Sequence, residues 1–337
     1  MQSKDALKVA FKNTYKRWVP VVEKEKGDLK TALSRFMTDD YFPIGINPKF
    51  TFPKSSSVFT IGSCFARHVE SALMQRGVNV LTGKFTFDSD HLLASVGAMG
   101  NVPNPRSLLN KYSTQAIHSE LDRVLNNKSA PDNGFLQVDA ENDLWVDPQL
   151  AAILKPLSFE ALSGIRTSVE NLVHSITMAD AVFITLGLSE TWYDKTSKLY
   201  LNSSPPPRLM RSMGDRFSFI NSSYEEAYAA ISESFEFIRK ASNKSVKFII
   251  TVSPVPMSTT WTEQDVVVAN SYSKSLLRVV AQNIAAKNED VDYYPSFEIV
   301  TTSPRRLAWQ SDNLHVKQEM VDFAISSFVN SYVTDSE

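Results

Sequence analysis

Short apolar segments that alternate with long amphipathic helices constrain the fold of this 337-residue chain more than any other feature. Residues 181–186 and 246–252 are mostly apolar, which is the pattern of strands buried on both faces of a parallel sheet. Residues 57–61 and 78–81 are typical of two earlier strands, and residues 292–294 of a short final one. We therefore expect a sheet whose strands are spread along most of the chain.

Helical periodicity lies between these strands. The expected helices cover residues 64–76, 89–99, 158–178, 224–240, 263–287 and 316–333. Strands and helices in this alternation need crossover connections, which are right-handed. The sequence predicts a three-layer α/β/α fold with a doubly wound parallel sheet. Ligands of such sheets bind beyond the carboxyl ends of the strands, so functional residues are expected in those loops.

Irregular sequence surrounds and interrupts this pattern. Residues 1–56 contain prolines and a glycine that break their helical patches, and we expect them to form an N-terminal extension that wraps the main domain. The main domain then covers residues 57–337. Two stretches within it, at 100–155 and 195–222, are rich in Pro, Asn and Ser and are expected to be irregular insertions, the first with a small hairpin.

Composition excludes several classes of protein. A net charge of −2 and a pI near 6.3 provide no basic field, so nucleic acid is not expected as a partner. The single cysteine allows no intrachain disulfide and no Cys-rich zinc site, and the histidines lack metal-ligand spacing. A lone free thiol favours the cytoplasm. No apolar run of about eighteen residues occurs, so no membrane span is expected; the oligomeric state stays open.

The stretch from Val58 to His68 joins the first strand to the first helix through Gly62, Ser63 and Cys64. Glycine permits a backbone turn that a Cβ would obstruct. Cys64 then stands at a helix N-terminus, where unpaired N–H groups and the dipole favour a thiolate. The alternative is a buried cysteine that packs as a small apolar residue.

A second polar loop, Ser311–His315, precedes the last helix. Asp312 lies three residues before His315 and can accept a hydrogen bond from one ring nitrogen. The other nitrogen is then free to act as a base, and the carboxylate stabilises the imidazolium. Taken alone the pair also fits a helix-capping Asp beside a surface His. Together with Cys64 it suggests a catalytic triad.

The residues Gly62-Ser63-Cys64-Phe65-Ala66 spell the motif of the GSCFA domain family, which resembles the SGNH/GDSL esterases and acyltransferases. The resemblance implies a flavodoxin-like, SGNH-hydrolase-like sheet. In GDSL-type enzymes the first block reads Gly-Asp-Ser, so Cys64 takes the place of the nucleophilic serine and Ser63 that of the aspartate. Cys64 is the first candidate nucleophile and Ser63 the alternative. The resemblance also implies that Asp312 and His315 form the final block.

The segment Gly187-Leu188-Ser189-Glu190 resembles the GDSL block Gly-x-Asn-Asp/Glu, whose Asn donates to the oxyanion. Ser189 stands at the Asn position, either as a weaker donor or as a cap of the following turn. Gly83 is the best match to the second-block glycine, whose N–H also faces the oxyanion. Gly187, Glu190 and Trp192 complete the candidate oxyanion and substrate-binding residues, since Trp192 could stack on a sugar ring or pack at the rim.

Two functions from different classes follow. The first is an O-acyltransferase or esterase that acts on a carbohydrate or polysaccharide precursor through an acyl group on Cys64 or Ser63. It would need no permanently bound cofactor, and acyl-coenzyme A would suit a cysteine because transfer between thioester and thiol is nearly isoenergetic. The second is a non-catalytic module that binds carbohydrate or a partner on the same fold.

Overall fold

A parallel sheet of five strands forms the centre of the protein. The computed structural model describes residues 2–20, 30–38, 40–93, 104–126, 128 and 134–335. The strands are β2 (Ser57–Gly62), β3 (Asn79–Val80), β6 (Ala181–Leu186), β10 (Lys247–Val252) and β11 (Val291–Tyr293). Their spatial order is β11-β10-β6-β2-β3, with every neighbouring pair parallel. Numbered along the chain this is the flavodoxin order 2-1-3-4-5, so the predicted fold class is confirmed.

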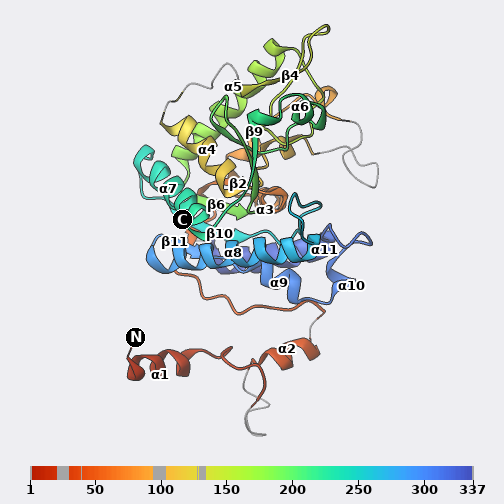
Figure 1. Cartoon of the computed structure of the whole chain (residues 1–337). Coiled ribbons are helices and arrows are strands. Elements are labelled where there is room, and N and C mark those ends of the chain that lie inside the picture. The colour runs from red at the N-terminus through yellow and green to blue at the C-terminus, as the bar shows by residue number, and fades with distance from the viewer. Residues whose placement is uncertain are drawn as a thin grey trace.

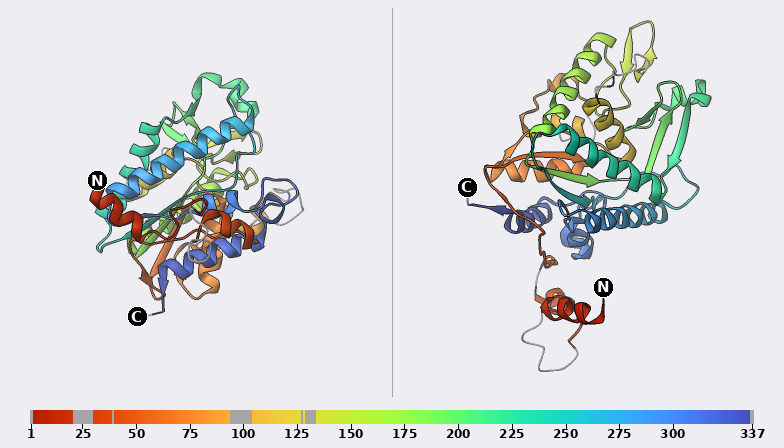
Figure 2. Two further views of the ribbon diagram at one scale, coloured as in Figure 1. Left: turned by 90° about the horizontal axis from the view of Figure 1, so that it is seen from below. Right: turned by 90° about the vertical axis from the view of Figure 1, so that its left-hand side faces the viewer.

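Helices cover both faces of this sheet (Figures 1 and 2). One face packs against α4 (Thr114–Leu125), α5 (Phe159–His174), α7 (Tyr224–Ala241) and α8 (Val266–Lys287). The other packs against α3 (Cys64–Gln75), α9 (Ser296–Thr302), α10 (Arg305–Ala308) and α11 (Gln318–Tyr332). Alternate residues of β6 serve the two cores: Val182 and Ile184 face the first, and Ala181 and Phe183 the second. A doubly covered strand must be apolar on both sides, as its sequence is.

The two predicted insertions are more regular than expected. The first holds the expected hairpin, β4 (Leu136–Asp139) with β5 (Leu144–Val146), and also α4, which packs on α7 over the sheet. The second contributes β8 (Leu199–Leu201), α6 (Pro207–Ser212) and β9 (Phe217–Asn221). β8 and β9 flank β7 (Glu190–Asp194) in an antiparallel sheet of order β8-β7-β9. The prediction of irregular structure was wrong for α4 and for these strands.

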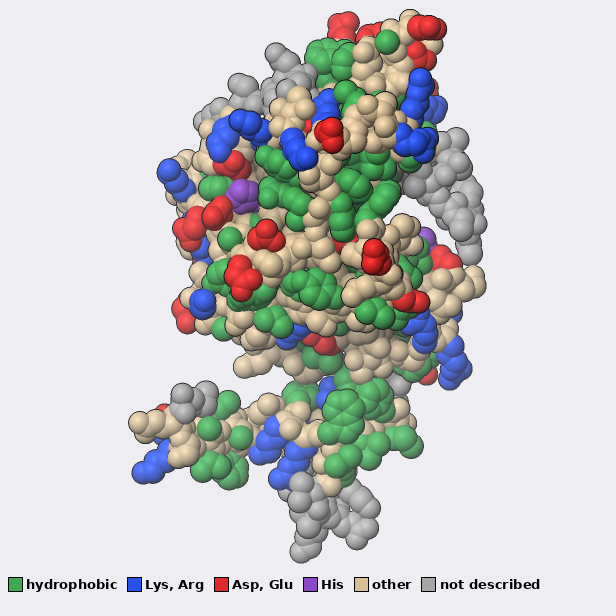
Figure 3. Space-filling view, viewed as in Figure 1, with side chains coloured by type: hydrophobic (Ala, Val, Ile, Leu, Met, Phe, Trp, Pro, Cys, Tyr) green, Lys and Arg blue, Asp and Glu red, His purple; other side chains and the backbone are tan. Residues whose placement is uncertain are grey.

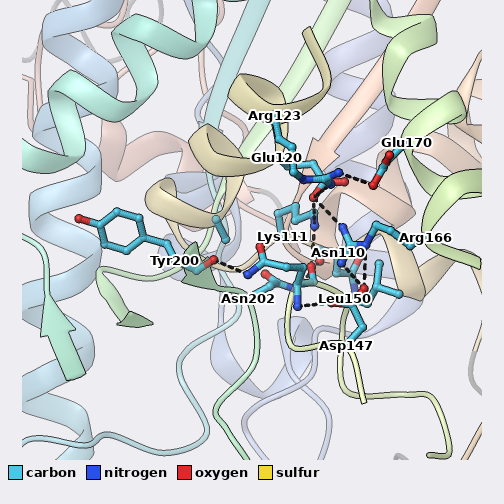
Figure 4. A network of polar contacts seen from close by, with 12 residues as sticks. Asn110, Lys111, Glu120, Arg123, Asp147, Leu150, Arg166, Glu170, Tyr200 and Asn202 are labelled. Atoms are coloured by element: carbon cyan, nitrogen blue, oxygen red, sulfur yellow. Dashed lines mark hydrogen bonds and ion pairs between the residues drawn. The ribbon is translucent and has the colours of Figure 1, made fainter. Parts of the chain in front are cut away.

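A buried network of charges fastens the first insertion to the main body (Figure 4). Glu120 on α4 accepts from Lys111 at 2.9 Å and from Arg166 of α5 at 3.1 Å, and Arg123 lies 3.2 Å away. Arg166 also pairs with Asp147. All five side chains are buried. Because each charge has partners of opposite sign, the network tolerates burial and fixes the chain just before α4.

The N-terminal extension divides into two parts. Residues 40–56 run along the main body: the N–H of Phe42 donates to Ser303 at 2.9 Å, and β1 (Phe52–Pro53) pairs in parallel with β12 (Val333–Thr334). The helices α1 (Ser3–Lys12) and α2 (Ala32–Thr38) lie apart from that body (Figures 1 and 2), and α1 buries none of its side chains. Figure 3 shows apolar side chains on this separate part. The predicted wrapping therefore describes residues 40–56 and not α1 or α2.

Two further expectations concern the helix predicted at 89–99 and the absence of a membrane span. The helix expected at 89–99 falls mostly outside the described residues, and its described beginning is a short 3-10 helix, Ser89–His91. Among the helices that the structure describes, none combines the length and the apolar character that a membrane span requires.

Candidate active site

The turn after β2 can be made only by glycine. Gly62 has a φ of +127°, and a Cβ added there would lie 2.1 Å from the backbone oxygen of Thr185 on β6. The N–H of Ser63 donates to that same oxygen at 3.2 Å. Strands β2 and β6 therefore stay together to the end of β2, and the chain then turns abruptly into α3.

Cys64 is the first residue of α3 and remains partly exposed. The backbone N–H groups of Cys64 and Phe65, at the start of the helix, favour the thiolate form of its sulfur. Burial of its surroundings raises the pKa of the thiol, while Lys274 and the two N–H groups oppose that rise. Ser63, in contrast, is only 3% exposed, and its hydroxyl has no hydrogen-bond partner among the described residues. Access from solvent favours the sulfur over the hydroxyl as nucleophile.

Asp312 and His315 form a tight pair in the loop before α11. One Asp312 oxygen accepts from the ring Nδ1 of His315 at 2.6 Å, and the other accepts from the backbone N–H groups of Leu314 and His315, both at 3.0 Å. These contacts, with the imidazole first, lower the pKa of Asp312 to about 2. Half of the His315 side chain is exposed (51%), and the pairing through Nδ1 leaves Nε2 free for another partner.

His68 connects this pair with α3. It lies one helical turn after Cys64, and burial lowers its pKa, with Asp322 acting in the opposite direction and His315 adding to the decrease. The charge of His315 thus acts on a residue of α3 that lies one helical turn after Cys64. Contact between the Cys64 sulfur and the His315 ring stays a prediction.

A loop from Asn110 to Ser113 crosses the same edge of the sheet. Lys111 donates from its backbone to the Gly62 oxygen at 2.8 Å, and Leu188 donates to the Tyr112 oxygen at 2.7 Å. A Cβ on Gly187 would lie 2.5 Å from the Tyr112 oxygen and 3.2 Å from the Ser63 Cβ, so a larger residue would push this loop away. Burial, followed by the charge of Cys64, raises the pKa of Tyr112 to about 12.

Ser189 and Gly83, the two candidate oxyanion donors, each make close contacts of their own in the structure. Ser189 is fully buried, and its hydroxyl donates to Asn221 at 2.7 Å, so that proton is already used. A Cβ on Gly83 would lie 2.2 Å from the sulfur of Met74, which is ten residues, or roughly 15 Å of helix, beyond Cys64 on α3. Gly83 therefore packs against the Met74 side chain of α3.

A cleft of about 440 Å³ opens beside Tyr112. Its walls include Glu190 and Trp192 of β7 and Trp261 from the loop after β10. The two tryptophan rings are nearly perpendicular with centroids 5.1 Å apart. Glu190 accepts from the backbone N–H of Trp261 at 3.0 Å, so it holds the loop that carries this ring. Glu190 and Trp192 thus both shape the cleft.

Comparison with known proteins identifies the family. A family model described as "GSCFA family" matches residues 57–328. The chain belongs to the GSCFA family. The family predicted from residues 62–66 is thereby confirmed. Among solved structures, the chain is similar to a Clostridium thermocellum family 3 carbohydrate esterase, with 10% sequence identity and a TM-score of 0.33 over 82% of this chain and 94% of that chain. A search of curated proteins found no match.

Sequence reasoning missed one residue of this GSCFA site. Lys274 on α8 is 2% exposed, and its amine donates to the Gly187 oxygen at 2.8 Å. Burial lowers its pKa to about 7, although the charge of Cys64 acts in the opposite direction. A lysine on the mostly apolar, buried side of α8 was the available signal, but a long amphipathic helix usually places its lysines in solvent.

The structure thus holds a partly exposed thiol at a helix N-terminus and, in the loop before α11, an imidazole oriented by a carboxylate. Among the residues that the structure describes, no group of three or more His, Cys, Asp or Glu side chains is arranged to hold a metal ion.

Proposed function

We propose that this GSCFA protein transfers acyl groups through a thioester on Cys64, as an O-acyltransferase or esterase. The observation that supports the proposal is the Asp312–His315 pair, whose charge acts on His68, one helical turn after Cys64. Cys64 itself is the first residue of α3 and is partly exposed. The resemblance of both motifs to the GDSL blocks supports the same assignment.

The residues divide the reaction as follows. The Cys64 thiolate attacks the acyl carbonyl, and the carbonyl oxygen takes up negative charge near the N–H groups of Cys64 and Phe65. The carbonyl re-forms, the leaving group departs with its electron pair, as a thiolate when the donor is a thioester, and the acyl group remains on Cys64. His315 then removes the proton from an acceptor hydroxyl or water, which attacks the thioester and releases Cys64. Asp312 keeps Nδ1 protonated throughout, so Nε2 takes the acceptor's proton and afterwards passes it to the released thiolate of the donor or to solvent.

A thiol nucleophile favours a thioester donor. Transfer of an acyl group from one sulfur to another is nearly isoenergetic, whereas transfer from an ordinary ester to sulfur is uphill. Acyl-coenzyme A is therefore the donor that suits Cys64 best, as a substrate and not as a resident cofactor. If Ser63 were the nucleophile, this argument would lapse and a plain esterase would be favoured.

The cleft beside Tyr112 supports a carbohydrate as acceptor. Tyr112 is close enough to Cys64 to feel its charge and also lines the cleft that contains Trp192 and Trp261. Aromatic rings in a polar-rimmed cleft can stack on the apolar face of a sugar while hydroxyl-bearing side chains bind its edge. A sugar held there would present a hydroxyl toward the sulfur.

The test compares Cys64→Ala with Ser63→Ala, using acetyl-coenzyme A and an activated acetate ester as donors. We expect Cys64→Ala to abolish acyl transfer and Ser63→Ala only to weaken it. Intact-protein mass spectrometry of the wild type, quenched in acid, should show one added acetyl group that maps to Cys64. Thermal melting confirms that both variants fold. A dead Ser63→Ala together with an active Cys64→Ala would make serine the nucleophile.

One observation favours the second candidate, a binding module without catalysis. The hydroxyl of Ser189, which stands where GDSL enzymes have their Asn donor, is committed to Asn221. A module would bind oligosaccharides in calorimetry and lose that binding in Trp261→Ala, yet never acquire an acyl group from either donor. Acetylation of Cys64 at catalytic rates would exclude it.

A further inference from the structure

Lys274 is a buried base that the mechanism above does not use. The other buried Lys and Arg side chains among the described residues each have a carboxylate within ion-pair distance; they are Arg67, Lys111, Arg123 and Arg166. Lys274 has no such carboxylate in the described part of the chain, and its one hydrogen bond is to the Gly187 oxygen. Burying an ammonium group without a counter-ion costs free energy. We therefore expect a charged Lys274 to be balanced by an anion other than a carboxylate.

The position of Lys274 identifies that anion. Its amine is held 2.8 Å from the Gly187 oxygen, and Gly187 is packed so closely against Ser63 that an added Cβ would lie 3.2 Å from the Ser63 Cβ. The amine is therefore held at Gly187, the residue that packs against the turn that presents Cys64. The influence is mutual, since Lys274 favours the thiolate form of Cys64 and Cys64 favours the charged form of Lys274.

We propose that Lys274 carries the positive charge that balances the Cys64 thiolate, and that the thiol proton passes to its amine when the sulfur becomes the nucleophile. The S–H bond breaks, the sulfur keeps the electron pair, and the lone pair of the neutral amine takes the proton. The pair is uncharged overall before and after this transfer, so no charge is added to a buried site. The proposal rests on the proposed function only in treating Cys64 as a nucleophile.

This assignment leaves His315 free for the second half of the reaction. Once the sulfur is acylated, the Lys274 ammonium remains beside the site, and its attraction favours departure of the thiolate when the acceptor attacks. Among the described residues, Tyr112 from the loop before α4 is a further titratable group on which the charge of Cys64 acts. Burial raises the pKa of its phenol to about 12, so Tyr112 does not compete with Cys64 for the charge of Lys274.

The test measures the ionisation of the thiol without any acyl donor. The rate of Cys64 alkylation by iodoacetamide is followed against pH in the wild type, Lys274→Met, Lys274→Arg and Lys287→Met. Lys287 is exposed near the end of the same helix and serves as a matched control.

We expect Lys274→Met to move the midpoint of the alkylation rate against pH upward by at least about one pH unit. Alkylation should then be about tenfold slower than in the wild type at pH values below both midpoints. Lys274→Arg should retain fast alkylation, and Lys287→Met should match the wild type. A wild-type profile in a folded Lys274→Met would overturn the proposal.

A reciprocal measurement keeps the proposal testable if Lys274→Met fails to fold. With ¹³Cε-labelled lysine, an NMR titration should show Lys274 losing its proton at lower pH in Cys64→Ala than in the wild type, because linkage is mutual. Identical titrations would overturn the pairing. Neither experiment measures acyl transfer, so the two proposals can fail separately. A protein without acyl-transfer activity could still pair Lys274 with the Cys64 thiolate, and an active enzyme could lack that pairing.

Discussion

Cys64 and His315 differ in the kind of contact that fixes their positions. Cys64 is placed by the backbone turn before it, whereas His315 is placed by a single neighbour, Asp312. The imidazole is half exposed, so little packing would keep it oriented without the carboxylate. Orientation by one hydrogen bond makes Asp312 the most sensitive residue of the site apart from the nucleophile.

Replacement of Asp312 by Asn should therefore leave the fold intact and lower kcat/KM by about 10²–10⁴. The amide cannot accept from Nδ1 in the same way while keeping its N–H contacts, and the other tautomer of His315 would then form. Acyl transfer from acetyl-coenzyme A measures the effect, with the exposed Asp215→Asn as control. Unchanged turnover in a folded Asp312→Asn would remove the triad from the mechanism.

At the scale of elements, the turn between β2 and α3 is the most constrained junction. Gly62→Ala would combine a positive φ with a Cβ only 2.1 Å from the Thr185 oxygen, and we expect a loss of a few kcal/mol of unfolding free energy. Gly164→Ala on α5 is the matched control, because nothing lies within 4 Å of its added Cβ and it should stabilise by about 0.5–1 kcal/mol. Urea denaturation measures both. Equal changes in unfolding free energy for the two variants would contradict the close contact between Gly62 and the Thr185 oxygen.

The elements that sequence reasoning found and missed differ in how they are buried. β6 was predictable because apolar residues fill both of its faces. The helix α4 was not, because its buried side includes Gln115, Glu120 and Arg123, which sequence patterns assign to solvent. The same applies to Lys274 on α8. The Cys64 turn and the Asp312–His315 pair were visible because each lies within a few consecutive residues, whereas contacts between distant loops leave no local pattern.

At the scale of the whole molecule, the charge network around Glu120 joins the first insertion to the sheet domain. Arg166→Met would leave Glu120 and Asp147 buried with fewer partners, and we expect a loss of about 3–5 kcal/mol in unfolding free energy. Lys244→Met, which removes an exposed pair with Asp180, should cost no more than about 1 kcal/mol. Similar losses of unfolding free energy in the two variants would show that the buried network stabilises the fold no more than an exposed ion pair does.

The same network should make the protein sensitive to acid. Burial alone would raise the pKa of Glu120, but Lys111, Arg166 and Arg123 hold it well below its usual value. A carboxyl group with a lowered folded-state pKa adds stability above its unfolded pKa, near 4.3, and loses it as the pH falls further toward the folded value. The unfolding free energy of the wild type should therefore fall below about pH 4, and Arg166→Met should lose less over that range.

The pairing of β1 with β12 has a consequence for how the domain could be rearranged. Phe52 lies opposite Val333 and Pro53 opposite Thr334, and the N–H of Lys54 donates to the Thr334 oxygen at 2.9 Å. The first and last strands of the domain are thus side by side in space, although most of the domain's sequence lies between them. A domain closed in this way can be joined end to end by a short linker and reopened at a surface loop, or inserted whole into a loop of a host protein. Its active site would be carried along undisturbed, because the turn, the imidazole loop and α8 all lie inside the closed circuit.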